Sequence, residues 1–227
     1  MPEQLIFDLP TRRAFGREDF FISPSNDVAV RIMEDWQNWP LGKLVLCGPK
    51  GSGKSHLAHI WAEDAGAIVV SAKVLAYERL ETLAEQPVVV EDADLLAQNE
   101  HGEAALFHLH NLMQETRHPM LITGADSIGS WNIKLPDLAS RLSGTQLASL
   151  SAPDDMLLSV LLIKLFSDRQ IMLEPTLIEY IVKRMDRSFA FAGELVRALD
   201  RASLKGQKPV TKRLAGRVLE DMLARDE

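Results

Sequence analysis

The sequence predicts an α/β fold, with a parallel sheet around a phosphate-binding loop, followed by a small all-α lid subdomain. Five short apolar runs alternate with helical patterns up to residue 150, and a glycine-rich loop directly follows the first run. Strand patterns then stop, and only helical patterns continue. A chain of 227 residues with 46% hydrophobic residues can bury one substantial core and a small second one.

The first part of the chain alternates between strand and helix signals. Strands are expected at 44–47, 67–70, 88–90, 120–123 and 147–150, and helices at 56–65, 72–84 and 103–116. An earlier helix is expected from Ser25 or Asn26 through Trp36, because these polar residues are good N-caps and Pro40 and Gly42 end the apolar stripe. The strand runs are continuously apolar, as in a parallel sheet covered on both faces.

The pattern changes at residues 151–155, where a proline between polar residues opens a run of helical segments. Helices are expected at 156–168, 175–185, 189–204 and 211–224. We therefore expect a tail and docking segment at 1–24, a nucleotide-binding subdomain at 25–151 and a helical lid at 152–227.

Residues 48–55 form a complete G-x-x-x-x-G-K-[ST] phosphate loop between a buried strand and a helix. The residues expected to bind ADP or ATP are Gly48, Gly51, Ser52, Gly53, Lys54 and Ser55. The glycines let backbone N–H groups wrap the phosphates, while Lys54 neutralises their charge and the Ser55 hydroxyl completes the shell of a Mg²⁺ ion. The positive N-terminal end of the following helix faces the same phosphates.

An acidic pair, Glu91 and Asp92, ends the strand at 88–90. A carboxylate at the tip of such a strand can reach the Mg²⁺ of a phosphate loop. Glu91 is expected to face the metal, and Asp92 to orient or activate the attacking water. The alternative is a strand that simply ends in a polar turn.

Composition excludes several classes of protein. The net charge of −7 and a pI near 5.4 argue against strong direct binding of duplex DNA through a broad basic face. No apolar run approaches the ~20 residues that span a bilayer, so we expect a cytoplasmic protein without membrane contact. His56 and His59, like His108 and His110, lack convincing metal-site spacing and are expected on helix surfaces.

The sequence resembles the DnaA initiator family of AAA+ ATPases, and within it the Hda-type regulatory inactivators. The matching segments are 20–22, 25–26, 53–56, 107–108 with 111, 135–142 and 199–203. The resemblance implies that Phe21, Ile22 and His56 also contact the nucleotide. From this resemblance we expect an initiator-like ATPase core without a DNA-binding domain, which agrees with the acidic pI.

The family implies two partners, a DnaA-type initiator and the DNA polymerase sliding clamp. Arg141 would be an arginine finger that enters the nucleotide site of a neighbouring subunit; the alternative is a surface arginine paired with Asp137. The tail residues Gln4, Leu5, Phe7 and Leu9 resemble a clamp-binding peptide, although they could instead cover the core. A homo-oligomer, as a dimer, and association with the nucleoid through the partners are also expected.

Some residues depart from the family pattern. Glu91 stands where initiators carry aspartate, Gly193 stands where the lid would carry a sensor arginine, and Thr123 or Asp126 would supply the sensor contact at a strand end. We therefore expect weak or no intrinsic hydrolysis, and a regulator that promotes hydrolysis of initiator-bound ATP. The alternatives are a self-sufficient AAA+ ATPase or clamp-loader-like motor, and a DNA-binding adaptor, which the charge disfavours.

Overall fold

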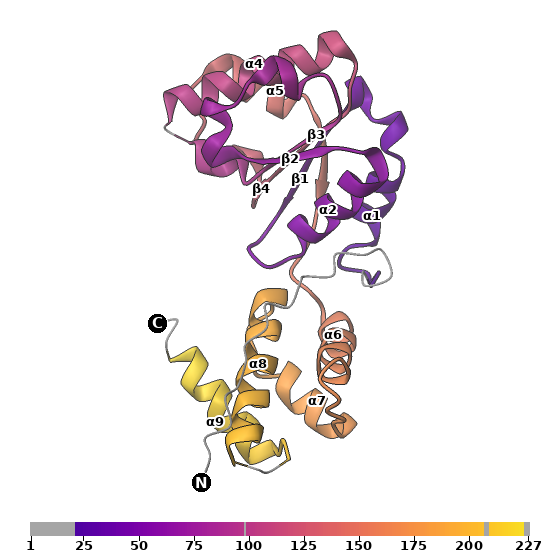
Figure 1. The fold of residues 1–227 in the computed structure, drawn as a ribbon, viewed down its shortest axis with the longest axis vertical. Coiled ribbons are helices and arrows are strands. Elements are labelled where there is room, and N and C mark those ends of the chain that lie inside the picture. The colour runs from indigo at the N-terminus through magenta and orange to yellow at the C-terminus, as the bar shows by residue number, and fades with distance from the viewer. Residues whose placement is uncertain (1–20, 98, 207–208, 225–227) are drawn as a thin grey trace, which may run out of the picture.

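The computed structural model describes residues 21–224, apart from residues 98, 207 and 208. Within them, a five-stranded parallel sheet has the order β2-β3-β4-β1-β5. The strands are β1 (Lys43–Gly48), β2 (Ile68–Ser71), β3 (Val88–Glu91), β4 (Met120–Ala125) and β5 (Gln146–Ser149). This arrangement confirms the predicted α/β class, with the phosphate-loop strand β1 paired on both sides (Figure 1).

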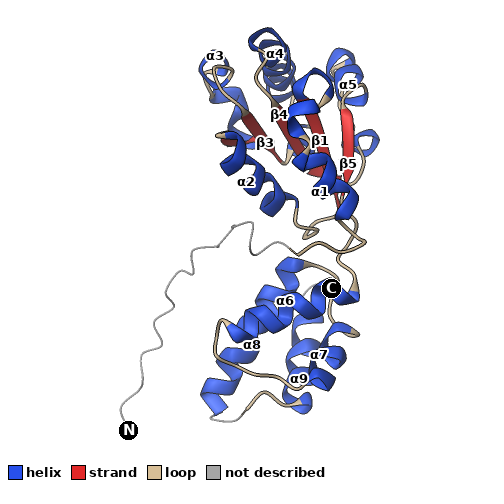
Figure 2. Ribbon diagram, turned by 90° about the vertical axis from the view of Figure 1, so that its right-hand side faces the viewer, coloured by secondary structure: helices blue, strands red, loops and turns tan. Residues whose placement is uncertain are grey.

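Helices cover both faces of the sheet, as the continuously apolar strands require. One face packs against α1 (Asp27–Glu34) and α2 (Lys54–Ala65), and the other packs against α4 (Glu100–Thr116) and α5 (Pro136–Ser143). The short α3 (Leu80–Leu83) lies beside α4. Figure 2 shows the three layers, with the strands enclosed between the two groups of helices.

A second group of helices follows β5 and lies below the sheet layers in Figure 2. It contains α6 (Asp155–Ser167), α7 (Pro175–Val182), α8 (Phe189–Gly206) and α9 (Lys212–Leu223). These helices bury their own apolar core, separate from the two cores that flank the sheet. The Asp154 carboxylate caps α6 by accepting the backbone N–H of Leu157 at 2.8 Å. None of the helices in the described part of the chain has both the length and the apolar character of a bilayer-spanning segment.

Two predicted helices were wrong in part. The segment expected as one helix at 72–84 is a 3₁₀ helix (Ala72–Tyr77), an extended Glu78 and the separate α3. Leu75 is fully buried while Val74 and Tyr77 are exposed, and the 3₁₀ helix packs against α4, so tertiary packing decides the conformation of this segment.

The first helix was expected to include Trp36, but α1 ends at Glu34 and Trp36 begins a 3₁₀ turn. This turn places the Trp36 ring edge-on to Trp61, with 6.2 Å between the ring centroids. The Trp36 indole N–H also donates to the Asp64 carboxylate at 3.1 Å. Tertiary packing therefore decides where this helix ends.

Among the glycines of the described chain, Gly124 in β4 leaves the least room for a side chain. A Cβ atom built there would lie 2.1 Å from the ring of the buried Trp131, whose indole N–H is fixed to the Ala125 carbonyl. Gly124→Ala is therefore expected to lower the free energy of unfolding by about 1–3 kcal/mol. Urea denaturation measures this change, with Gly129→Ala as the matched control because a Cβ there meets nothing within 4 Å. Equal midpoints for the two variants would contradict the packing described here.

Candidate functional site

The phosphate loop joins β1 to α2 at the carboxyl edge of the sheet. Gly51 and Gly53 have φ angles of +76° and +94°, which side-chain-bearing residues rarely adopt. A Cβ at Gly51 would also lie only 2.5 Å from the Cβ of Ser188. Glycine is therefore required here, and the loop leads directly into the N-terminus of α2, whose free N–H groups favour an anion.

Lys54 and Ser55 occupy the first turn of α2. The Lys54 ammonium donates to the carbonyls of Gly48 at 2.7 Å and Pro49 at 3.0 Å, so it spans the loop. Burial lowers the pKa of Lys54, and the nearby Asp92 and Asp94 partly oppose this effect. In a nucleotide complex, charged phosphate oxygens would take the place of these two neutral carbonyls as acceptors of the Lys54 hydrogen bonds.

The rest of the loop fits a polyphosphate. Ser52 is 4% exposed, and in the described structure its hydroxyl oxygen is a buried atom without a hydrogen-bond partner. Ser55 is exposed at the helix start, where its hydroxyl is open to a cation. His56 follows it on the same helix and is partly buried.

The predicted nucleotide-contacting residues Phe21 and Ile22 are exposed by 37% and 57%. The side-chain amide of Asn26 donates to the Phe21 carbonyl at 2.9 Å and fixes the backbone just before α1. Their contact with a nucleotide stays a prediction.

The acidic pair lies at the same sheet edge as the loop, because β3 and β1 run parallel. Glu91 ends β3, and its Oε1 atom is buried, lies 3.9 Å from His59 Nδ1 and has no hydrogen-bond partner among the described residues. Asp92 is exposed and has φ of +57°; its backbone N–H donates to the Thr123 hydroxyl at 3.2 Å. An unused carboxylate oxygen beside a phosphate loop fits a Mg²⁺ ion that keeps most of its waters. Glu91 and Ser55 would hold that ion, which neutralises phosphate charge when bound.

The lid contacts the phosphate loop directly through Phe189, a contact that the sequence did not indicate. The backbone N–H of Phe189, the first residue of α8, donates to the Gly51 carbonyl at 3.0 Å. The Phe189 ring lies 3.2 Å from the position that a Cβ at Gly53 would take. A change in the loop on nucleotide binding would therefore reach α8 without an intermediary.

Arg187 and Arg197 lie on either side of Gly193 in the sequence. Arg197 lies one turn further along α8, and its Nη1 atom is 3.8 Å from the position of a Cβ at Gly193. Arg187 instead donates to the Asp155 carboxylate at 2.5 Å and to the Pro153 carbonyl, at the start of α6. Arg187 is therefore bound at the start of α6, while Arg197 lies beside Gly193; contact of either arginine with a nucleotide stays a prediction.

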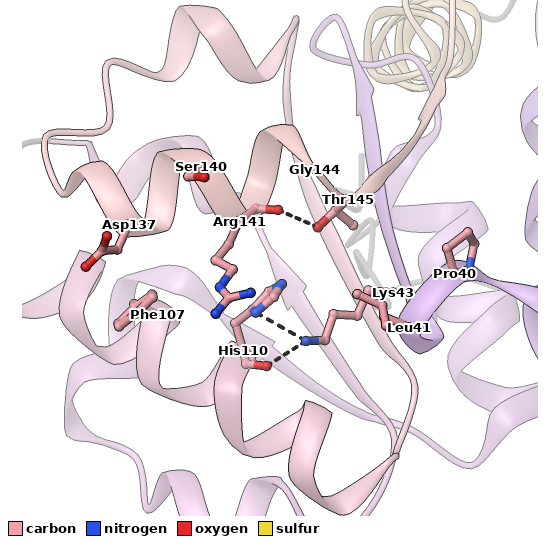
Figure 3. Close-up of a pocket in the computed structure, with 10 residues that line it drawn as sticks. All are labelled: Pro40, Leu41, Lys43, Phe107, His110, Asp137, Ser140, Arg141, Gly144 and Thr145. Carbon is pink, nitrogen blue, oxygen red and sulfur yellow. Dashed lines mark hydrogen bonds between the residues drawn. The ribbon is translucent and has the colours of Figure 1, made fainter.

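Arg141 lies at the opposite, amino-terminal edge of the sheet. It is exposed on the last turn of α5 and lines a cavity with Lys43, the first residue of β1 (Figure 3). In the described structure no ion pair joins Arg141 to Asp137, which is the pairing expected of an ordinary surface arginine. The guanidinium is thus available to a ligand or a partner.

A buried carboxylate that the sequence did not reveal fixes the start of α5. Glu103 on α4 is 2% exposed and accepts the backbone N–H groups of Lys134 at 3.0 Å and Leu135 at 2.7 Å. These bonds satisfy donors just before a helix that begins at Pro136. Glu103 therefore sets the position of the helix that carries Arg141.

The predicted surface position of His110 was wrong. His110 is 2% exposed, and its Nδ1 atom lies 3.2 Å from the ammonium of Lys43, which is itself 1% exposed. A histidine on an amphipathic helix is as compatible with burial as with exposure, so only the tertiary partner decides. No cluster of three or more potential metal ligands occurs in the part of the chain described here.

The tail residues Gln4, Leu5, Phe7 and Leu9 lie outside the described residues. Their assignment to the sliding clamp stays a prediction from the resemblance.

Comparison with models of known protein families gives no match. An uncharacterized protein of Haemophilus influenzae is 30% identical over 177 residues, which cover 73% of this chain and 76% of that protein.

Solved structures share the fold. Domain III of the replication initiation protein DnaA from Thermotoga maritima is 16% identical, with a TM-score of 0.80 over 94% of this chain and 98% of that one. AMPPCP-bound DnaA from Aquifex aeolicus is 14% identical, with a TM-score of 0.71 over 83% of this chain and 66% of that one. The Thermotoga maritima RuvB Holliday junction branch migration motor is 19% identical, with a TM-score of 0.62 over 78% of this chain and 61% of that one. The chain thus has the AAA+ fold of DnaA domain III and spans just under two thirds of the longer DnaA chain.

Proposed function

Because this chain belongs to the family of the uncharacterized Haemophilus influenzae protein and has the fold of DnaA domain III, we propose that it regulates the initiation of chromosomal replication. In this proposal it binds ADP or ATP with Mg²⁺ at residues 48–55 and docks on the DNA-loaded sliding clamp through residues 4–9. It then supplies Arg141 to a DnaA-type initiator and promotes hydrolysis of the initiator-bound ATP. The protein would be cytoplasmic and would associate with the nucleoid through its partners. It would form a homo-oligomer, as a dimer.

The separation of the two edges of the sheet is the observation that carries this proposal. The six residues of β1 separate Lys43, beside Arg141, from Gly48 in the phosphate loop. At 3.3 Å per residue this distance is about 17 Å. Arg141 cannot reach a phosphate in its own loop, so a catalytic role for it requires nucleotide on another molecule.

The central experiment measures turnover of initiator-bound ATP with and without clamp loaded on DNA. Addition of the protein is expected to accelerate hydrolysis only when loaded clamp is present. Deletion of residues 2–9 is expected to abolish the clamp-dependent stimulation of hydrolysis. The nucleotide affinity is expected to stay unchanged, because the deleted residues lie outside the phosphate loop. Full stimulation by the deleted protein would contradict clamp docking through the tail.

The second candidate is a self-sufficient AAA+ ATPase or clamp-loader-like motor, in which Asp92 organises the attacking water. The exposed Asp92 beside Glu91 favours it, whereas the absence of a sensor arginine at Gly193 does not. A steady-state ATPase assay on the purified protein alone separates the two candidates. Robust turnover without a partner would favour the motor.

A further inference from the structure

A cavity of about 460 Å³ opens between α4, α5 and the beginning of β1. Its polar lining comes from Lys43, His110, Asp137, Ser140, Arg141 and Thr145. Figure 3 shows the Arg141 side chain directed toward His110 and Lys43, while the single carboxylate of the lining, on Asp137, lies at the other end of the cavity. One end of the cavity is therefore cationic.

Lys43 and His110 form an unusual buried pair at this end. The Lys43 ammonium donates to His110 Nδ1 at 3.2 Å and to the His110 carbonyl at 2.7 Å. An ammonium can only donate, so Nδ1 is the acceptor and the ring proton resides on Nε2. That Nε2 atom is buried and has no hydrogen-bond partner among the described residues. His110, which lines the cavity, thus carries a buried N–H donor that lacks an acceptor.

The charges at this end are equally uncompensated. No carboxylate of the described chain lies within ion-pair distance of Lys43 or Arg141. Burial first, and then the charge of Arg141, lower the pKa of Lys43 to about 8. Burial first, and then the charges of Lys43 and Arg141, lower the pKa of His110 to about 4. At neutral pH the lysine is therefore charged and the histidine is neutral. A buried cation whose partners are both neutral costs stability.

We propose that this cavity is a binding site for one phosphate-type oxyanion, held by the Lys43 ammonium, the Arg141 guanidinium and the His110 Nε2–H. Such an anion supplies the acceptor that Nε2 lacks and the negative charge that the two cations lack. Its tetrahedral oxygens can meet donors from three elements, β1, α4 and α5, whereas a carboxylate offers only two oxygens. The site is separate from the phosphate loop, and it does not depend on the identity of the initiator or the clamp.

Two sources can present this chemistry, free inorganic phosphate and the terminal phosphoryl group of a nucleotide. The test uses the full chain carrying Lys54→Ala, which weakens binding at the phosphate loop. Inorganic phosphate is titrated while the ¹⁵N resonance of the His110 Nε2 atom is followed, and ATP is titrated in a second arm. Saturable binding of either anion with a shift of this resonance is expected; the tighter arm identifies the source.

Variants decide whether the named residues form the site. Lys43→Met and Arg141→Ala, each added to Lys54→Ala, are expected to weaken anion binding by about tenfold or more, since each removes a charge-assisted contact. Lys73→Met is the matched control, because Lys73 is an exposed lysine on the same domain outside the cavity, and it is expected to bind like the parent. Arg141 is exposed, so its alanine variant tests the site even if Lys43→Met fails to fold. The proposal is overturned if neither anion binds saturably, or if Arg141→Ala binds both anions as tightly as the control.

Discussion

Arg141→Ala is expected to lower the stimulation of initiator-bound ATP hydrolysis by about 10³-fold or more, the scale on which arginine fingers contribute to phosphoryl transfer. The guanidinium would stabilise charge that develops on the transferring phosphoryl group, an interaction made mainly in the transition state. Arg141→Lys keeps the charge but loses the planar fork of donors, so an intermediate defect is expected. Single-turnover hydrolysis of labelled ATP on the initiator measures both effects.

Two controls make this result specific. Arg213→Ala removes an exposed arginine from α9 of the lid and is expected to leave stimulation unchanged. Arg141→Ala should leave the affinity of the phosphate loop for ADP unchanged, because about 17 Å of strand separates Arg141 from that loop. Retained stimulation by Arg141→Ala would defeat the proposed finger.

Lys54→Ala is expected to weaken ADP binding by about a hundredfold. The lysine now bonds two neutral carbonyls, and with nucleotide bound it would make charge-assisted bonds that contribute about 1.5–3 kcal/mol each. Isothermal titration of ADP in the presence of Mg²⁺ measures the loss.

Lys50→Ala is the matched control for this variant. Lys50 is an exposed lysine in the same loop, so it tests whether a general loss of positive charge explains the effect. It is expected to change the ADP affinity by less than about threefold, because exposed charges are screened by solvent and salt. Equal losses for the two variants would mean that Lys54 makes no specific contact with phosphate.

The sheet could be predicted from the sequence because each buried parallel strand is a short, continuous apolar run. The phosphate loop could be predicted because its residues are contiguous, so the sequence motif contains all the residues of the loop. The segment at 72–84 was assigned wrongly because its apolar residues fit a helical period, whereas the exposed Tyr77 and the extended Glu78 depend on packing against α4.

The cavity beside Arg141 could not be predicted for a different reason. Lys43 and His110 are 67 residues apart, and neither is expected to be buried from its own neighbours in sequence. The contact of Phe189 with Gly51 likewise joins distant segments through backbone atoms, which carry no residue-specific signal. Both features arise only after β1, α4, α5 and α8 have taken their places.

The position of β1 between β4 and β5 has a thermodynamic consequence. Its first residue lines the cavity and its last begins the phosphate loop, so both ends belong to one strand that is bonded on each side. Local unfolding of such a central strand would disrupt the cavity and the phosphate loop together, so the two sites share a single unfolding equilibrium. Nucleotide at one edge therefore protects the arrangement at the other by mass action, even without any movement between them.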